Sequence, residues 1–405
     1  MYRTGLPIRL PYVQDMTRIH VRTLGMALLI ALSPIRALAS GDAPAFLLVG
    51  LDGKTFFTLD GSRNGPNGSD AVGIIDASDE AHPRLVHTLT LDNSVYGPPT
   101  NLRVTPDGRL GLVASSVLMH HDGTAWYAHA DNRLHVIDLT ATPPRLIETV
   151  EVGQQPSGIS ISRTGDLALI ANREGRSVTV LSILGSKVRP VATIDVGDEA
   201  AAVAFAANGR RAFVAKNKAA RIGVLSINGT SVRYEPEYDM PVGAGVYGLD
   251  VTPDGTLALT GNTGQEPSDG HADTISVIRA DGLRPVVLDH LGIGDTPEAL
   301  VIAPDGRHAA VSIVRGSSAA RGSPGYTPTG AVALLTLSSQ SVQMTSQAEA
   351  GAVTQGVAFS PSGDYVYVCN YVDRNLGIYR ISGDTLIDTG NRLSLPGQPA
   401  SLAGR

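Results

Sequence analysis

Three histidines and two aromatic residues lie close together in the stretch 119–130 of the chain. They are His120, His121, Trp126, Tyr127 and His129. Aromatic rings can stack on a sugar, and imidazoles donate hydrogen bonds or act as a general base near neutral pH. We therefore expect Trp126, Tyr127 and His129 to bind a ligand, with His121 as a candidate base. The alternative is that Trp126 folds back onto its own loop and the histidines are solvated.

Metal binding is a weaker interpretation of these and neighbouring residues. A zinc site needs three or four converging ligands, and outside this stretch only His271 has an obvious claim. The segment DGSRNG resembles the start of a calcium loop, because oxygen donors alternate before a glycine. Its donors would be Asp60, Ser62, Asn64 and Asp70. The glutamate that closes such a loop is absent, so we favour no cofactor and keep calcium as the open alternative.

The first 39 residues have the layout of a secretory signal peptide. Basic residues precede the apolar run LGMALLIAL, and the following ALA predicts cleavage after Ala39. Met16 is a candidate for the true start of translation. The apolar run is far shorter than the roughly 20 residues that span a bilayer. We therefore expect a periplasmic or secreted mature protein of residues 40–405, without stable membrane insertion.

Charge and motifs narrow the function classes. Removing residues 1–39 leaves 27 basic and 37 acidic side chains, so nucleic acid and anionic membranes are poor partners. Cys369 is the only cysteine, so no internal disulfide can form, and its strand-like surroundings predict a buried, inert thiol. The chain has no Gly-x-Ser-x-Gly elbow, His-Glu-x-x-His pair, Cys-x-x-Cys-His haem site or glycine-rich phosphate loop.

A recurring phrase points to the architecture that must position these side chains. VTPDGRLGLVAS at 104–115 places a Pro-Asp-Gly turn between two apolar runs, and five later segments follow the same template. The turn glycines are Gly108, Gly165, Gly209, Gly255, Gly306 and Gly363. They are 44 to 57 residues apart, close to the length of a four-stranded propeller blade. Proline presets the turn, aspartate caps it and glycine accepts a positive φ.

Short apolar runs alternate with Gly, Pro, Asp and Asn in each unit. This pattern predicts the order strand, turn, strand, loop, strand and strand. The first unit lacks a strand before Phe46, whereas 398–405 matches a first strand and then stops. Pairing these two segments completes a seventh unit and removes exposed sheet edges. We predict one all-β domain over 40–405, a seven-bladed β-propeller of four-stranded blades. Pairing of the C-terminal strand with the N-terminal blade closes the ring.

One tetrapeptide carries a family resemblance. Tyr367-Val368-Cys369-Asn370 differs by one letter from the Y-V-T-N sequence that names a family of bacterial propeller repeats, and LIAN at 169–172 is similar. The resemblance to YVTN-type repeats covers about 98–381 and implies the propeller fold, but the family includes proteins of unassigned role. Related seven-bladed propellers include lactonases, which open sugar or muconate lactones, and haem-carrying domains of nitrite reductases. No residue of either catalytic set can be matched to this chain.

The predicted loops between second and third strands are long in four units, whereas the hairpin turns stay short. One long loop contains the stretch 119–130 and another the calcium candidate. The other two carry His271, and Arg315 with Tyr326. Because such loops emerge on one face of the disc, we expect them to form a binding face.

Aligned first strands place polar side chains near one mouth of the central channel. Tyr247, Glu298 and Gln355 occupy equivalent positions, and Gln155 and Glu199 lie one layer outward. They predict a polar, mildly anionic funnel for hydroxyl-bearing or cationic ligands. The alternative is that these side chains only bind loop backbone and channel water.

Two functions remain open from the sequence. The first is an exported propeller, expected to be monomeric, that binds a small polar ligand or a protein partner through its long-loop face. The second is a lactonase-like hydrolase, in which Glu199, Glu298 or His121 activates water and Arg315 or Tyr247 stabilises the oxyanion.

Overall fold

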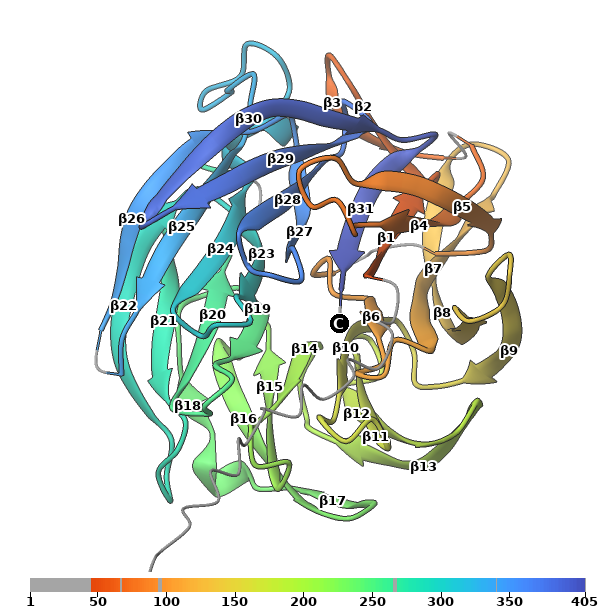
Figure 1. Cartoon of the computed structure of the whole chain (residues 1–405), viewed down its shortest axis with the longest axis vertical. Helices are drawn as coiled ribbons and strands as arrows, with labels where there is room; N and C mark the ends of the chain where they lie inside the picture. The colour runs from red at the N-terminus through yellow and green to blue at the C-terminus, as the bar shows by residue number, and fades with distance from the viewer. Residues whose placement is uncertain (1–44, 66–67, 94–96, 265–267, 340, 405) are drawn as a thin grey trace, which may run out of the picture. The chain divides into compact units, whose positions relative to one another are not determined.

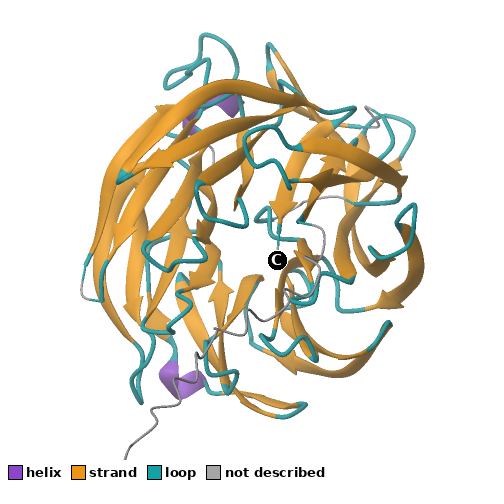
Figure 2. Cartoon of the chain, in the orientation of Figure 1, coloured by secondary structure: helices purple, strands orange, loops and turns teal. Residues whose placement is uncertain are grey.

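The structure is a computed structural model that describes residues 45–65, 68–93, 97–264, 268–339 and 341–404. Among these residues, the strands form seven antiparallel sheets of at least four strands each, plus one separate hairpin. The sheets follow one another around a common centre (Figure 1). In these described ranges, strands and loops account for nearly all of the ribbon, and helix occurs only as two short 3₁₀ turns (Figure 2). The predicted seven-bladed all-β propeller is therefore confirmed.

In each of the first three blades, the strands run in order from the channel outward. Blade 1 consists of β31 (Gln398–Ala403), β1 (Phe46–Asp52), β4 (Ala71–Asp76) and β5 (Arg84–Thr90). Blade 2 consists of β6 (Leu102–Val104), β7 (Leu110–His121), β8 (Trp126–Asp138) and β9 (Arg145–Glu151). Blade 3 consists of β10 (Pro156–Ile161), β11 (Leu167–Asn172), β12 (Ser177–Leu184) and β13 (Lys187–Asp195).

The other four blades follow the same order. Blade 4 consists of β14 (Ala200–Phe205), β15 (Arg211–Lys216), β16 (Arg221–Asn228) and β17 (Ser231–Tyr234), with the short β18 (Met240–Pro241) also beside β16. Blade 5 consists of β19 (Val246–Val251), β20 (Leu257–Asn262), β21 (Asp273–Arg279) and β22 (Val286–Gly294). Blade 6 consists of β23 (Pro297–Ile302), β24 (His308–Ile313), β25 (Ala331–Leu337) and β26 (Val342–Glu349). Blade 7 consists of β27 (Thr354–Phe359), β28 (Tyr365–Asn370), β29 (Asn375–Ser382) and β30 (Thr385–Ser394). The extra hairpin is β2 (Thr55–Thr58) and β3 (Gly61–Asn64), and the 3₁₀ turns are η1 (Pro236–Tyr238) and η2 (Arg315–Ser318).

The ring closes between the two ends of the propeller, as the sequence predicts. β31 pairs antiparallel with β1, with Ala403 opposite Leu48 and Gln398 opposite Asp52. Apolar side chains of blades 1 and 7, among them Leu47 and Tyr367, form one buried cluster across the junction. Closure therefore joins the chain ends by both hydrogen bonds and apolar burial.

Burial decreases from the channel outward. Every residue of the second strand β11 is buried, whereas the outer strand β13 is largely exposed and alternates along its length. Inner strands are apolar on both faces because neighbouring blades cover them. Cys369 lies in β28 at 0 % exposure, and burial raises the pKa of its thiol, so the predicted buried thiol is confirmed.

The recurring Pro-Asp-Gly phrase forms the first hairpin of a blade. In blade 2, the Asp107 carboxylate accepts hydrogen bonds from the Arg109 N–H at 3.1 Å and the Thr105 hydroxyl at 2.6 Å. Gly108 has φ 72°, a left-handed conformation that favours glycine. Asp254 repeats the Asp107 contacts in blade 5, with Thr252 and Thr256 as donors.

Two of the predicted long loops are instead β-hairpins, which corrects the sequence interpretation. β7 continues to His121 and β8 begins at Trp126, so the chemistry-rich stretch forms a ladder that closes at a four-residue turn. The Asp122 carboxylate caps this turn by accepting the N–H groups of Thr124 and Ala125. The segment after β1 likewise forms the β2–β3 hairpin. Cross-strand pairing satisfies backbone groups that a long loop would leave to water.

Candidate functional site

One hydrogen bond recurs where blades 3 to 7 meet the long-loop face. The N–H of the residue after a second strand donates to the carbonyl of the residue just before a first strand. Examples are Arg173 to Gln155 at 2.9 Å and Tyr371 to Val353 at 3.2 Å. Gln155, Thr296 and Val353 adopt left-handed φ values of 54–58° at this step. The residues after the second strands are thereby fixed around the channel mouth.

Arg173, Glu199, Asn217, Lys218 and Tyr247 form a polar cluster at this mouth, which we call the Arg173 cluster. The Glu199 carboxylate bonds to the Arg173 guanidinium at 3.2 Å and to the Lys218 ammonium at 2.9 Å. Arg173 also donates to the Asn217 side chain at 3.4 Å and lies 5.7 Å from the centre of the Tyr247 ring. Blades 3, 4 and 5 all contribute to this cluster.

The electrostatics of the Arg173 cluster favour a charged Glu199. Burial alone would raise the pKa of this carboxyl, but the Lys218 hydrogen bond and the Arg173 charge outweigh it and lower the pKa. Glu199 is therefore a weak proton acceptor. Arg173 and Lys218 add two positive charges beside Glu199 that the predicted mildly anionic funnel did not include. The sequence alignment missed them, since Arg173 and Lys218 follow second strands rather than line first strands.

The registers of the first strands define equivalent positions from blade to blade, and each set of equivalent positions is called a step. One such step in β19, β23 and β27 holds Tyr247, Glu298 and Gln355. Tyr247 is buried, and the other two are half-buried. The structure thus brings Glu199 and Tyr247 to one guanidinium, and places Glu298 and Gln355 on the two following blades. Gln155 is half-buried and lies in the same blade as Arg173. Its backbone carbonyl accepts the Arg173 N–H.

A hollow of about 660 Å³ lies between blades 5 and 6, apart from the Arg173 cluster. Its lining includes Arg315, Tyr326, Asp295 and Gln347. Arg315 has φ 55° and donates to the Gln347 side chain at 3.2 Å. The structure therefore brings Arg315 and Tyr326 together, in a hollow that Glu298 does not line. His271 is exposed and pairs with Asp269 at 3.3 Å.

The residues of the β7–β8 hairpin pair mainly with one another. His121 and Trp126 have ring centroids 4.9 Å apart, and His120 and His129 5.6 Å. Trp126 also packs against Gly65 beside the β2–β3 hairpin. Tyr127 is 48 % exposed. These contacts do not bring His121 to Glu199 or Tyr247. The Trp126–His121 contact lies within the hairpin, as in the alternative in which the tryptophan folds back onto its own loop, whereas the contact with Gly65 reaches another segment.

The residues considered for calcium do not converge. Asp60 lies in the β2–β3 turn near the Arg63 guanidinium at 3.9 Å, and Ser62 and Asn64 lie on β3. Asp70 instead forms an ion pair with Lys54 and accepts the N–H groups of Gly53 and Asn93. Its oxygens are used inside the protein. Among the described residues, no group of three or more His, Cys, Asp or Glu side chains has the geometry to hold a metal ion.

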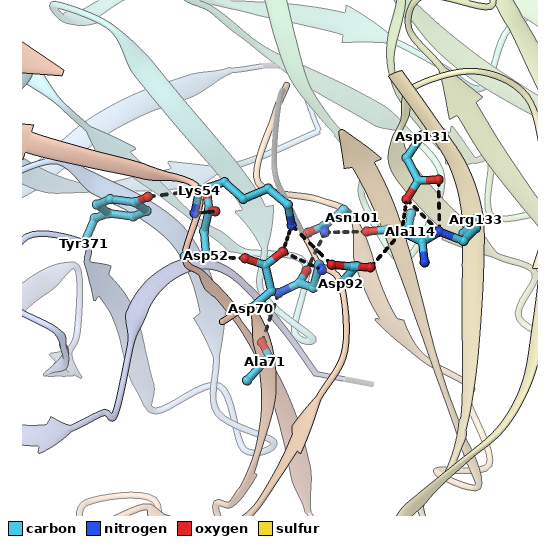
Figure 3. A network of polar contacts seen from close by, with 12 residues as sticks. Asp52, Lys54, Asp70, Ala71, Asp92, Asn101, Ala114, Asp131, Arg133 and Tyr371 are labelled. Atoms are coloured by element: carbon cyan, nitrogen blue, oxygen red, sulfur yellow. Dashed lines mark hydrogen bonds and ion pairs between the residues drawn. The ribbon is translucent and has the colours of Figure 1, made fainter. Parts of the chain in front are cut away.

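A charge network with a buried and a half-exposed part lies on the same face, between blades 1, 2 and 7 (Figure 3). Lys54 pairs with Asp70 and lies 3.7 Å from Asp92, and Arg133 bridges Asp92 and Asp131 at 2.8 and 2.7 Å. These ion pairs link blade 1 to blade 2. No sequence prediction included Lys54, Asp92, Asp131 or Arg133, because their partners are separated by up to 41 residues.

Asp52 lies at the edge of this network, as the last residue of β1 and opposite Gln398 in the closing strand pair. Its carboxylate accepts the Lys54 N–H at 2.7 Å and the Tyr371 hydroxyl at 3.3 Å. Burial raises the pKa of Asp52 to about 6, although the Lys54 N–H and ammonium oppose the rise. Asp52 is only 4 % exposed, so it contributes to blade closure rather than to an open site.

Comparison with known protein-family models finds no match, and comparison with curated proteins finds none either. Solved structures do match. A periplasmic gluconolactonase from Pseudomonas aeruginosa is 18 % identical with a TM-score of 0.63, over 89 % of this chain and 98 % of that one. A putative 6-phosphogluconolactonase from Bacteroides fragilis is 16 % identical with a TM-score of 0.62, over 91 % and 99 %. A functionally unknown protein from Desulfotomaculum acetoxidans is 14 % identical with a TM-score of 0.65, over 89 % and 98 %.

These similarities define the class of protein. The chain is a seven-bladed β-propeller whose structural neighbours are 6-phosphogluconolactonase-like propellers. At these identities the likeness concerns the fold alone. No helix in the described part of the chain has the length and apolar character to cross a membrane. The predicted signal peptide at 1–39 lies outside the described residues.

Proposed function

We propose that this propeller binds a small hydroxylated carboxylic acid, such as a sugar acid or its lactone, at the Arg173 cluster. The observation that carries the proposal is the sharing of Glu199 between Arg173 and Lys218 beside the Tyr247 ring. Guanidinium and ammonium groups donate to hydroxyls and carboxylates, Glu199 accepts from hydroxyls, and an aromatic ring packs against a sugar's C–H face. The two cations and one carboxylate favour one negative charge on the ligand.

Binding without catalysis is the primary proposal because Glu199 is held by two cations with a lowered pKa. A general base works best with a pKa near the operating pH. We also propose that the chain is exported to the periplasm or secreted, is monomeric and is built from YVTN-type repeats. Mass spectrometry of the exported protein should find Ser40 as its first residue, and a chain retaining residues 1–39 would contradict export by cleavage.

The binding proposal is tested by calorimetry with gluconate on residues 40–405. We expect Glu199→Gln and Arg173→Met to weaken gluconate binding at least tenfold, because each removes one side of the charge pair. The matched control is Arg189→Met, which removes the Arg189–Glu148 ion pair between outer strands and should leave gluconate affinity unchanged. Equal weakening in all three variants, or no gluconate binding by the parent protein, would refute the proposal.

Lactone hydrolysis is the second candidate, and one observation favours it. Glu298 lies half-buried on the strand step that neighbours Tyr247, where a carboxylate can activate water. With glucono-δ-lactone as the probe, a hydrolase should lose at least a hundredfold in kcat/KM on Glu298→Gln while its gluconate affinity changes little. Equal turnover by parent and variant would clear Glu298 of a catalytic role.

A further inference from the structure

A further hollow, outside the long-loop face, lies in the central channel. A cavity of about 570 Å³ is lined by first strands and by the hairpin turns that follow them, including Pro106, Pro304 and Pro361. The cavity therefore extends to the face opposite the Arg173 cluster. Its volume falls within the range of small-molecule sites.

At one level of the channel wall, formed by equivalent positions of the seven first strands, two side chains carry opposite charges. Strand registers give each blade one residue at this step, and five of the seven residues are small. The small residues are Ser160, Ala204, Val301, Ala358 and Ala403. The other two are Arg103 on β6 and Asp250 on β19, which belong to blades three positions apart in the ring. A ring of small side chains thus leaves open space around one cation and one anion.

The two charged groups do not pair directly. No ion pair joins Arg103 and Asp250, and the Arg103 guanidinium donates to the Leu102 carbonyl of its own strand at 3.2 Å. A guanidinium has five N–H donors, so this hydrogen bond leaves donors available for a ligand. The Asp250 carboxylate is fixed instead, because it accepts the N–H groups of Val251 at 2.9 Å and Ile302 at 2.8 Å.

Burial affects the two groups in opposite directions. Desolvation lowers the pKa of Arg103 and raises that of Asp250, and the charge of each group partly opposes the shift of the other. Both groups are half-buried and line the same cavity, so a ligand that carries both opposite charges would replace the water around them. Arg163 lies at the hairpin-side mouth and reaches the Pro253 carbonyl of another blade, so entry from this side passes a guanidinium.

We propose that the central channel binds a small zwitterion of the amino-acid class, with its carboxylate at Arg103 and its ammonium at Asp250. Arginine binds a carboxylate through two parallel hydrogen bonds, and Asp250 keeps lone pairs for an ammonium group. This site is separate from the Arg173 cluster. It uses first-strand residues at the other end of the channel, so it does not depend on the sugar-acid proposal.

Calorimetry and thermal shift with residues 40–405 test the proposal. The probes are glycine, 4-aminobutyrate and 6-aminohexanoate, which separate the two charges by increasing lengths, with acetate and methylammonium as single-charge controls. We expect at least one zwitterion to bind and raise Tm, and both single-charge controls to bind at least tenfold more weakly. Acetate binding as tightly as the best zwitterion, or no zwitterion binding, would overturn the proposal.

Variants locate the binding. Arg103→Met and Asp250→Asn should each weaken zwitterion binding at least tenfold, while gluconate binding at the Arg173 cluster stays unchanged. Val301→Phe fills the channel at the same step without altering a charge and should also abolish zwitterion binding, which covers the case in which a charge variant fails to fold. Exposed Arg109→Met, on the same hairpin as Arg103, is the matched control and should bind normally. Zwitterion binding that survives both Val301→Phe and the charge variants would place the ligand elsewhere and contradict the proposal.

Discussion

At the scale of single residues, the role of a side chain depends on whether it lies inside a junction between blades or at the channel mouth. Asp52 and Arg173 both lie next to the end of a second strand, yet Asp52 is buried in the closure and Arg173 lies at the channel mouth. The sequence could propose Tyr247 and Glu199 because the repeat places first strands in register. It could not propose Arg173, because its partners Glu199 and Tyr247 come from other blades. It could not propose Lys54 either, because its partners Asp70 and Asp92 flank later strands of blade 1.

The raised pKa of Asp52 makes a prediction about stability and pH. The carboxyl titrates near its ordinary value of 3.8 when unfolded and at about 6 when folded, so the folded state binds more protons between these values. Its contribution to stability is therefore present below about pH 4 and is lost as pH rises through about 6. Asp52→Asn should reduce the fall in unfolding free energy between pH 4.5 and 7.5 by up to about 2 kcal/mol. Urea unfolding at both pH values measures this.

Asp122 is the control for Asp52, because the folded structure lowers its pKa instead of raising it. Hydrogen bonds from Thr124 and from the Ala125 N–H lower the pKa of Asp122 to about 2, so its contribution is present above its unfolded pKa and is lost as pH falls toward 2. Asp122→Asn should therefore not reduce the fall in stability between pH 4.5 and 7.5. An unchanged pH dependence in Asp52→Asn would show that Asp52 is not titrating in this window.

At the scale of elements, the β7–β8 hairpin shows how strand pairing overrides a loop interpretation. Histidines, aspartate and glycine between two apolar runs suggest a loop, but the cross-strand pairs continue from Val117–Ala130 to His121–Trp126. The inner part of the ladder is held by the blade, and Leu118 and Tyr127 near the tip are exposed. The tip therefore adds little to the apolar core.

Shortening this hairpin tests that conclusion. Replacing residues 118–129 with Asn-Gly joins Val117 to Ala130, a cross-strand pair suited to a two-residue turn. Tm should change by no more than a few degrees, because no buried core residue is removed, and gluconate affinity should be unchanged. Circular dichroism melting and calorimetry measure both. A loss of gluconate binding would return Trp126, Tyr127 and His129 to the candidate site.

At the scale of the whole molecule, neighbouring first strands approach one another closely around the channel. A Cβ on Gly356 of β27 would lie 2.5 Å from the backbone nitrogen of Leu402 in β31. The equivalent addition at Gly248 of β19 meets its nearest atom at 3.4 Å. The junction that closes the ring is thus packed more tightly than the junction between blades 5 and 6 at the same step.

Gly356→Ala should therefore destabilise the protein through its closure. The added methyl group would displace backbone of β31, at a cost of about 1–3 kcal/mol, and chemical unfolding would report a lower midpoint. Gly248→Ala is the matched control and should cost less than about 1 kcal/mol, since its neighbours can move by a few tenths of an ångström. Equal midpoints for the two variants would show that the β31–β27 contact does not limit stability.

The sequence by itself determined the repeat, the number of blades and the closure by residues 398–405, because turn chemistry and apolar runs are local signals that recur with the blade. It also determined which strand steps face the long-loop mouth. Only the tertiary structure decided which charges meet there. Arg173 with Glu199 and Arg133 with Asp92 join residues from neighbouring blades. At the other end of the channel, Arg103 and Asp250 line one cavity from blades three positions apart. These placements depend on how the blades are turned and spaced around the ring.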